Sequence, residues 1–569
     1  MSKTPLFDAA IEKLLSGAVP HTRVCEETGE SFEITAKDIE MCRLLKMPLP
    51  KTVWWARMRQ KRSFLGGFDL FRRSLPDGRS IVTMYDPESF ATFIPSEEWY
   101  SDTFDPFSYG IAIDPTQPFL TQWDLFSHGM PRAALMTDAK SVGSEWSIYY
   151  LNLKNGYNCW GTWDSEDILY ADQTLNSKHS SDLSLSKDCE WCYDSVMCKK
   201  CARVSYSERC QNSMDLLFCL ACRNCSDCFG STNLRNKRFV FLNEQLDGDE
   251  YKKRIAEIDL TDATVVEAWR TKIHQDVWNK AIRCGESMTN VQNAVGDDIE
   301  NSRDVYGVSV FDSERVYHCM LTWSGKDCYD SIGGLKFELC ANDLCSVESS
   351  NMRMDILCLN SINLEYSEFC DNCEDCFGCI GLRHKKFCIF NRQYTEEEYW
   401  PLVDAIKTAM LERGEYGDFF PHQMNPIAFN ASHAMALWPT EEQEARRIGM
   451  RWYSFNDEKN GEASAMSELP QRLVDTTDAI LDQKFRCPAT SRIFRYVKPE
   501  LDFHRTMNLA LPRVHPSIRR YGRAAQQFAM RLHHRSCDKC GAGMQSRIPD
   551  SHKGTVYCQK CYEELVTNA

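Results

Sequence analysis

Small and apolar residues recur at a fixed spacing through residues 187–243. One column places a cysteine at every ninth position: Cys192, Cys201, Cys210, Cys219 and Cys228. Two further columns of Cys, Ser, Leu and Val lie three residues before it and three residues after it. Each unit of nine residues therefore reads x-x-C-x-x-C-x-x-S.

This period fits neither a single helix nor a flat strand. Nine residues are two and a half α-helical turns, so successive units on one helix would present opposite faces. A flat strand turns every second side chain to the same face, not every third. A short repeat must bury its apolar face against its neighbours. We therefore expect a thin β-solenoid with a bend in each unit, and the period leaves the number of units per coil open.

The pattern returns further along the chain. The segment CRNCSDCFGSTNLRNKRFVFLN from Cys222 is matched at constant offset by CDNCEDCFGCIGLRHKKFCIFN from Cys370. We predict a first solenoid at 146–245, a helical connector at 246–295, a second solenoid at 296–392 and a helical or irregular connector at 393–481. In the last of these, Thr395 followed by Glu398 has the capping-box pattern of a helix start, and Gly414 is placed to end that helix.

The two ends of the chain are copies of one module. At one constant offset, Cys25 matches Cys487, Thr28 matches Thr490, and Arg57 matches Arg519. We predict an N-terminal ribbon-like module at 1–100, an aromatic docking segment at 101–145 and a C-terminal basic zinc-ribbon module at 482–569. The expected fold class is mainly β with helical connectors, with two tandem cysteine-lined β-solenoids between related zinc-ribbon-like modules.

The C-terminal module carries the most specific metal signal. Two C-x2-C pairs have the spacing of a tetrahedral zinc site on two knuckles: Cys537, Cys540, Cys558 and Cys561. The N-terminal copy has lost these ligands and holds other residues near the equivalent places: Leu75, Gly78, Pro95 and Glu98. One zinc ion is therefore expected.

The cysteines of the two solenoids admit three interpretations. Runs of four with spacing three, from Cys219 and from Cys370, resemble the iron–sulfur spacing of ferredoxins. However, Ser231 stands where Cys379 stands, and the columns also accept Leu, Val and Thr. Because a free cysteine behaves as a small hydrophobe, structural packing is favoured, while zinc knuckles and an iron–sulfur cluster stay open. The expected structural cysteines are Cys192, Cys201, Cys210, Cys219, Cys228, Cys340, Cys358 and Cys376.

Length and charge narrow the class of protein. A chain of 569 residues is too long for one core and predicts several domains. A formal net charge of −15 argues against a coat of nucleic acid over the whole surface, but a local basic face remains compatible with it. The 28 cysteines, with no apolar signal region or membrane-length apolar run, lead us to expect reduced thiols and a cytoplasmic protein without membrane contact.

Arginines of the terminal modules are candidates for nucleic-acid contact, because a guanidinium group binds phosphate and a neighbouring tryptophan can stack on unpaired bases. The candidates are Arg513, Arg519, Arg520 and Arg523 in the C-terminal module and Arg57 and Arg59, beside Trp54 and Trp55, in the N-terminal module. Two alternatives are pairing with the chain's own surplus of acids and a surface that binds protein.

Together these motifs resemble an uncharacterised cysteine-rich repeat and zinc-ribbon family that is frequent in candidate-phyla bacteria and metagenomic sequences. The resemblance implies no activity. We expect a non-enzymatic binding or scaffold protein, with no catalytic residues, whose terminal modules engage nucleic acid or a ribonucleoprotein. The alternatives are an iron–sulfur or metal-binding redox protein that uses the solenoid cysteines, and a purely structural assembly component. Protein partners and the oligomeric state stay open.

Overall fold

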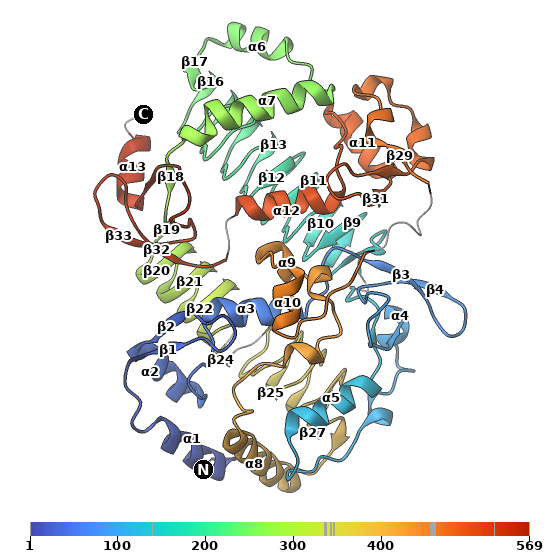
Figure 1. The fold of residues 1–569 in the computed structure, drawn as a ribbon, viewed down its shortest axis with the longest axis vertical. Coiled ribbons are helices and arrows are strands. Elements are labelled where there is room, and N and C mark those ends of the chain that lie inside the picture. The colour runs from blue at the N-terminus through green and yellow to red at the C-terminus, as the bar shows by residue number, and fades with distance from the viewer. Residues whose placement is uncertain are drawn as a thin grey trace.

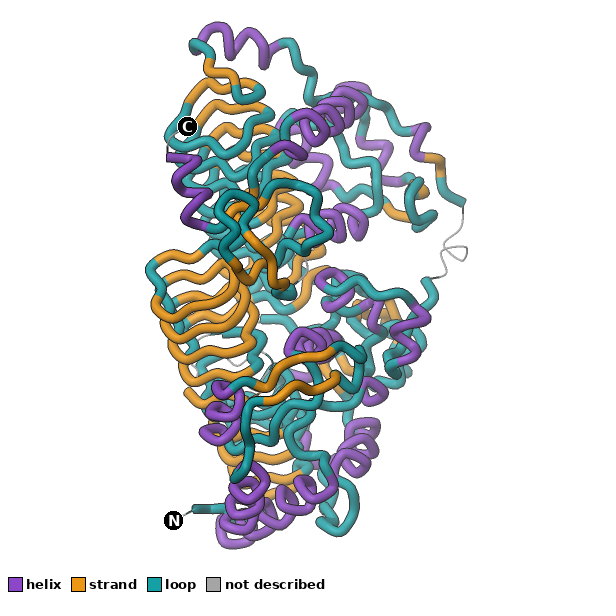
Figure 2. Tube along the Cα trace, turned by 60° about the vertical axis from the view of Figure 1, so that its left-hand side comes forward, coloured by secondary structure: helices purple, strands orange, loops and turns teal. Residues whose placement is uncertain are grey.

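A computed structural model describes residues 2–138, 140–334, 338–341, 344, 347–455, 462–527 and 530–567. Helix and strand occupy nearly equal shares of the chain, so the mainly β expectation is confirmed only in part. Parallel strands lie side by side along the length of the molecule, and helices and loops pack against them (Figure 1, Figure 2). None of the described helices combines the length and hydropathy that a bilayer crossing requires.

The first stack is a single sheet whose strands follow one another in chain order from β9 onward, while β7 pairs with β9 and β8 pairs with β10. All its pairs are parallel except the last, β16 with β17. Its strands are β7 (Trp146–Ile148), β8 (Leu151–Lys154), β9 (Tyr157–Trp160), β10 (Trp163–Leu169), β11 (Lys178–Ser184), β12 (Tyr193–Val196), β13 (Ala202–Ser205), β14 (Met214–Leu217), β15 (Ser226–Phe229), β16 (Arg238–Phe241) and β17 (Glu244–Gln245).

The second stack is built in the same way from two successive sheets, and it also ends in an antiparallel pair, β27 with β28. The strands are β19 (Met288–Thr289), β20 (Gln292–Glu300), β21 (Arg303–Phe311), β22 (Glu314–Trp323), β23 (Lys326–Tyr329), β24 (Glu338–Ala341), β25 (Ile362–Glu365), β26 (Glu374–Phe377), β27 (Lys386–Ile389) and β28 (Arg392–Gln393). Short stretches of the predicted second solenoid, 335–337, 342–343 and 345–346, lie outside the described residues.

Through most of both stacks the chain returns beside itself every 12 residues. Ser181 pairs with Tyr193, which in turn pairs with Ser205, and the backbone N–H of Cys192 donates to Ser180 Oγ at a separation of 12 residues. Along the stack, within the strands as well as between them, residues with left-handed φ recur at every third position, as at Asp188, Trp191 and Asp194. A non-glycine residue in this conformation costs about 1–2 kcal/mol, least for Asn and Asp. The bend therefore recurs every three residues, and the backbone pairing follows steps of 12.

The period of nine in the sequence is a consequence of these triplets. One residue in three turns inward, so any multiple of three brings back an inward position. The Cys189 thiol donates to the carbonyl of Cys198, nine residues on, at 3.5 Å. Ser195 Oγ donates to the carbonyls of Tyr193 and Val204, both at 3.1 Å. Cysteine and serine are therefore interchangeable here, because both are small and both find a backbone acceptor.

The two terminal modules have matching elements. The N-terminal module comprises α1 (Pro5–Leu15), β1 (His21–Val24), β2 (Ser31–Ile34), α2 (Ala36–Leu45), α3 (Trp54–Ser63), β3 (Phe71–Ser74) and β4 (Ser80–Thr83). The C-terminal module comprises β30 (Phe485–Arg486), β31 (Ile493–Phe494), α11 (Lys498–Met507), α12 (Pro516–Gln526), β32 (His533–Ser536), β33 (Gly543–Ser546), β34 (Val556–Tyr557) and α13 (Gln559–Thr567). Under the offset that relates Cys25 to Cys487, α2 coincides with α11, and both helices end at a left-handed residue, Lys46 and Asn508.

Shorter elements join these parts. Between the N-terminal module and the first stack lie β5 (Phe93–Ile94), α4 (Ser96–Trp99), η1 (Pro106–Tyr109), α5 (Phe119–Gly129) and β6 (Arg132–Ala133). The connectors contain α6 (Gly248–Ala256), α7 (Ala263–Asp276), η2 (Trp278–Lys280), β18 (Arg283–Cys284), α8 (Glu396–Arg413), η3 (His422–Met424), η4 (Phe429–Ala431), α9 (Ala434–Leu437), α10 (Glu442–Arg447), β29 (Ser464–Ala465), η6 (Met466–Glu468), η7 (Leu473–Asp475) and η8 (Asp478–Asp482). The predicted capping box and end of α8 are confirmed: Thr395 and Glu398 cap its start, and Gly414 ends it with left-handed φ.

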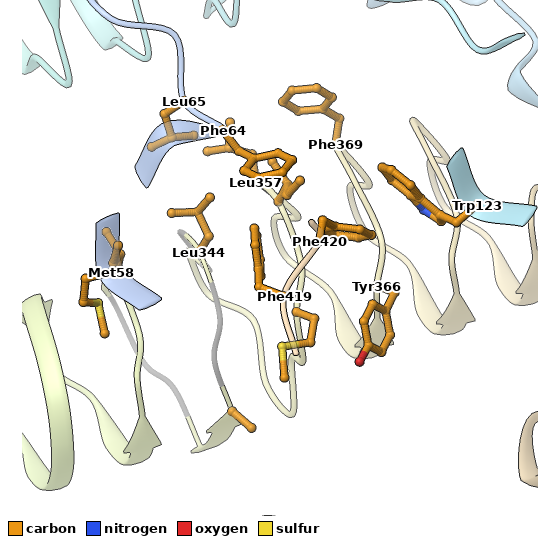
Figure 3. Packing of buried hydrophobic residues seen from close by; sticks show 14 of the residues in the cluster. Met58, Phe64, Leu65, Trp123, Leu344, Leu357, Tyr366, Phe369, Phe419 and Phe420 are labelled. Carbon is orange, nitrogen blue, oxygen red and sulfur yellow. The ribbon is translucent and has the colours of Figure 1, made fainter. Parts of the chain in front are cut away.

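Each terminal module packs on the stack that is remote from it in the sequence. Met58 and Phe64 of the N-terminal module join Leu344 and Leu357 of the second stack in one cluster, together with Phe419 of the following connector (Figure 3). In the C-terminal module, α11 and α12 contact β11 and β12 of the first stack.

Buried ion pairs hold both modules in equivalent ways. Arg57 of α3 pairs with Asp330 of the second stack, its Nη2 donating to Oδ1 at 3.1 Å. In the first stack, Arg519 and Arg523 of α12 pair with Asp182, at 3.0 and 2.8 Å. Asp182 and Asp330 are related by the offset that relates Cys222 to Cys370. The duplicated modules therefore use the same acidic position of the duplicated stacks.

Replacing Asp182 by Asn tests this docking. The substitution would leave Arg519 and Arg523 buried with less compensating charge, so we expect a loss of about 3–5 kcal/mol in the free energy of unfolding, measured by urea denaturation. D502N, which removes an exposed pair with Lys498, is the matched control and should change stability little. Equal effects of the two substitutions would contradict a docking role for Asp182.

Acid should weaken the same interface through His504. Burial, and next the charge of Arg519, lower the pKa of this imidazole to about 3. The unfolded chain then binds more protons than the folded chain below about pH 6.5, so stability is fully present above that pH and falls as the pH drops toward 3. We expect H504Q to reduce the slope of unfolding free energy between pH 6 and 4 by up to about 1.4 kcal/mol per pH unit. An unchanged slope in urea titrations across this range would contradict it.

Candidate metal centre

The four C-terminal cysteines meet at the ends of two short turns. Cys537 follows β32 and accepts the N–H of Gly541 on its carbonyl at 2.9 Å, and Gly541 takes the left-handed φ of 74° that this turn requires. Cys558 follows β34, and Cys561 lies in the first turn of α13. The sulfur atoms of Cys537, Cys540, Cys558 and Cys561 all lie within 4.8 Å of one another.

This geometry fits a tetrahedral ion held by thiolates. With metal–sulfur bonds of about 2.3 Å, tetrahedral ligands stand about 3.8 Å apart, and the sulfur atoms of Cys540 and Cys558 are 3.8 Å apart. Burial opposes ionisation of Cys537, but hydrogen bonds from the backbone of Cys558, Cys540 and Lys539 lower its pKa to about 6. The group can therefore hold a metal ion, as the sequence predicts.

The equivalent hairpin of the N-terminal module keeps its turn without the ligands. The N–H of Leu75 donates to the carbonyl of Arg79 at 2.8 Å, and Gly78 has a φ of 88°. The strand after it is tied to the aromatic segment, because the N–H of Met84 donates to the carbonyl of Ala134 at 3.0 Å. In the N-terminal module, backbone hydrogen bonds thus hold the hairpin at the position where the C-terminal module has its candidate metal site.

The cysteines inside the stacks are buried thiols. Among the described residues, the four C-terminal cysteines are the only group of three or more Cys, His, Asp or Glu side chains whose ligand atoms lie close enough together to hold a metal ion. Burial raises the pKa of Cys159 to about 11 and that of Cys319 to about 12, which keeps them protonated at neutral pH. Hydrogen bonds from the neighbouring thiols of Cys370 and Cys376 instead lower the pKa of Cys373 to about 4. The eight predicted structural cysteines are all buried among other apolar side chains: Cys192, Cys201, Cys210, Cys219, Cys228, Cys340, Cys358 and Cys376.

The three predicted phosphate-binding arginines of α12 contact the chain itself. Arg519 pairs with Asp182 and Glu500, both at 3.0 Å, and Arg523 also pairs with Asp182. Arg520 donates to the backbone and side-chain oxygens of Asn158 at 2.9 Å.

The other three are engaged in the same manner. Arg513 donates to the carbonyls of Pro470 and Leu469 at 3.0 Å. Arg57 pairs with Asp330, and Arg59 pairs with Glu27. The alternative considered for these arginines, pairing with the chain's own acids, describes most of their contacts. To bind phosphate, these side chains would have to leave their present partners.

Sequence reasoning missed the acids that receive these arginines. Asp182 and Asp330 lie in the stacks, far along the chain from their partners, and only the matching of both offsets could have connected them. The tyrosine hydroxyls that accompany them were missed as well. Tyr170 donates to Glu500 at 2.9 Å, and Tyr329 donates to Asp38, the N-terminal equivalent of Glu500, at 2.9 Å.

No protein-family model matches this chain, and the search of curated proteins finds no match either. The family resemblance seen in the sequence therefore stays an expectation.

Replacing Cys537 and Cys540 by Ser should abolish metal binding by the purified protein, measured by elemental analysis. It should also expose the C-terminal module to proteolysis, because a structural metal contributes folding free energy. C379S is a matched control, since Ser231 already stands at the equivalent position of the first stack. This control should keep the metal. Full metal content in the double variant would exclude the site.

Proposed function

We propose that this protein is a non-enzymatic binding or scaffold protein in which two β-solenoids carry a zinc-held module that engages nucleic acid or a ribonucleoprotein. Four thiolates are the ligand set of structural zinc sites, and such an ion supplies folding free energy when bound. The residues that would hold it are Cys537, Cys540, Cys558 and Cys561.

The solenoid part of this proposal is supported by pairing on several sides of each 12-residue step. Successive parallel pairs join Asp172 with Ser184, Leu175 with Lys187, Lys178 with Glu190, and Ser181 with Tyr193. The partners are three residues apart along the step, so pairing accompanies each triplet. A chain that pairs with itself at four points in every step has the connectivity of a coil.

The observation that carries the proposal is the position of the part of the C-terminal module that bears the four cysteines, residues 530–567, which we call the metal module. It lies between the two stacks (Figure 1). On one side the Tyr562 hydroxyl donates to Asn233 of the first stack at 2.9 Å. On the other, Arg547 donates to Asp297 of the second stack at 2.6 Å, with both side chains buried. A metal ion that folds this module would therefore set the geometry between both stacks, which is the role of a scaffold.

The alternatives remain distinguishable. A redox protein that uses the stack cysteines would need several thiolates that converge on one cluster, and among the described residues the four C-terminal cysteines are the only group that converges in this way. A purely structural assembly component would form ordered oligomers without nucleic acid.

The proposal predicts that the purified, metal-loaded protein retards mixed single-stranded RNA or DNA in a gel-shift titration. The apparent affinity should fall steeply between about 50 and 200 mM salt, because phosphate contacts release counterions. The apparent affinity should fall further when the metal is removed by a chelator. A protein that retains one zinc and shifts neither nucleic acid would refute this function, and an iron-containing, coloured anaerobic preparation would favour the redox alternative.

A further inference from the structure

We propose that a column of polar and cationic side chains on the first stack, next to the metal module, binds the phosphate groups of a single-stranded nucleic acid. The inference rests on the function proposed above and names the surface that performs it. The members of the column are Lys187, Lys199, Gln211, Arg223 and Arg235, and successive members are bridged in parallel. Neighbouring strands are about 4.7–4.9 Å apart, so the column presents its side chains in a line at regular spacing.

Four members of the column, Lys199, Gln211, Arg223 and Arg235, line a cavity of about 650 Å³ between the first stack, the start of the second stack and the metal module. Six lining residues are Lys or Arg and two are acidic, although the whole chain carries a net charge of −15. The metal module contributes Gln559, Tyr562 and Glu563 to the lining. Arg235 lies over the ring of Tyr562, 5.8 Å from its centroid. The cavity therefore combines local positive charge with an aromatic side chain.

The cations at this surface differ in whether a described residue provides them with an anionic partner. Lys199 pairs with Glu300 at 2.7 Å, and Arg283 pairs with Glu208 at 2.7 Å. By contrast, within the described residues the side chains of Lys187, Arg223 and Lys237 make no ion pair or hydrogen bond.

A buried donor of the lining is also left without an acceptor. Arg209 Nε is buried and has no hydrogen-bond partner among the described residues, although the carboxylate of Glu208 lies 3.5 Å away.

The second stack provides an internal comparison. The offset that relates Cys222 to Cys370 maps the last four members of the column to Val347, Leu359, Asp371 and Arg383. Leu359, Asp371 and Arg383 are bridged in the same way. Only Arg383 is cationic, and it donates to the carbonyl of Trp99. The 12-residue step does not require cations at this position, so the charge is specific to the first stack.

A linear array favours a linear polyanion. Arg and Lys bind phosphate oxygens strongly, and a basic groove with an aromatic side chain is the usual surface for single strands. Acidic peptides offer carboxylates instead, without bases to stack on an aromatic ring.

The test is a fluorescence anisotropy titration of full-length, metal-loaded protein against a labelled single-stranded 20-mer. We expect the double variant Lys187→Gln with Arg223→Gln to bind at least about fivefold more weakly at about 50 mM salt, and to lower the slope of log K against log salt by about 1.4. The control variant Arg203→Gln with Arg238→Gln removes the same charge from other exposed positions of this stack and should bind as wild type. Metal content and thermal midpoint should match wild type in both variants, because the replaced side chains are exposed.

The outcomes separate the two proposals. If wild type binds and the column variant binds equally well, the site assignment fails and the proposed function stands. If metal-loaded wild type binds no strand, both fail. Competition by polyglutamate as effective as that by unlabelled RNA would identify an acidic-peptide surface and overturn the assignment. Binding of ATP, lost in the column variant, without binding of the 20-mer would assign the cations to a free nucleotide and overturn it too.

Discussion

The return of the chain beside itself every 12 residues is the constraint on which the rest of the structure depends. It requires a bend at every third residue, and those bends require a left-handed backbone that most side chains resist. Asn and Asp adopt this conformation at the lowest cost. Side-chain amides at the bends then bond from one step to the next, as Asn152 does to Asp164 at 2.7 Å. The same geometry leaves one inward residue in three and a narrow interior, which favours cysteine and serine.

Docking of the terminal modules follows from what the stacks present on their outer side. Each stack buries one carboxylate at the equivalent position, Asp182 or Asp330, and each module supplies arginine from the equivalent helix. A buried carboxylate without its partner is strongly unfavourable. The arginines that make the C-terminal segment basic are therefore largely used inside the molecule. Arg223 and Lys237, which line the cavity beside the C-terminal cysteines, belong to the first stack.

Several parts of the fold could be predicted because their signals are local. The spacing of Cys537, Cys540, Cys558 and Cys561 fixes two turns, and the Thr395 capping box fixes a helix start. The step of 12 could not be distinguished from nine, since both are multiples of the triplet and only hydrogen bonding chooses between them. The burial of Arg519 could not be foreseen, because Asp182 lies far from it in the sequence. Reading the first stack in steps of 12 would have aligned Lys187, Lys199, Arg223 and Arg235 beforehand.

The docking of each terminal module on the stack that is remote from it in the sequence also affects folding during translation. During synthesis the first stack leaves the ribosome long before α12. Asp182 therefore stays unpaired with Arg519 and Arg523 until nearly the whole chain has been translated. The N-terminal module likewise cannot dock until the second stack has been translated. Neither half can complete its interior alone, so the molecule acquires its final packing only at the end of translation, and a chain truncated before α12 would carry an open acidic face on its first stack.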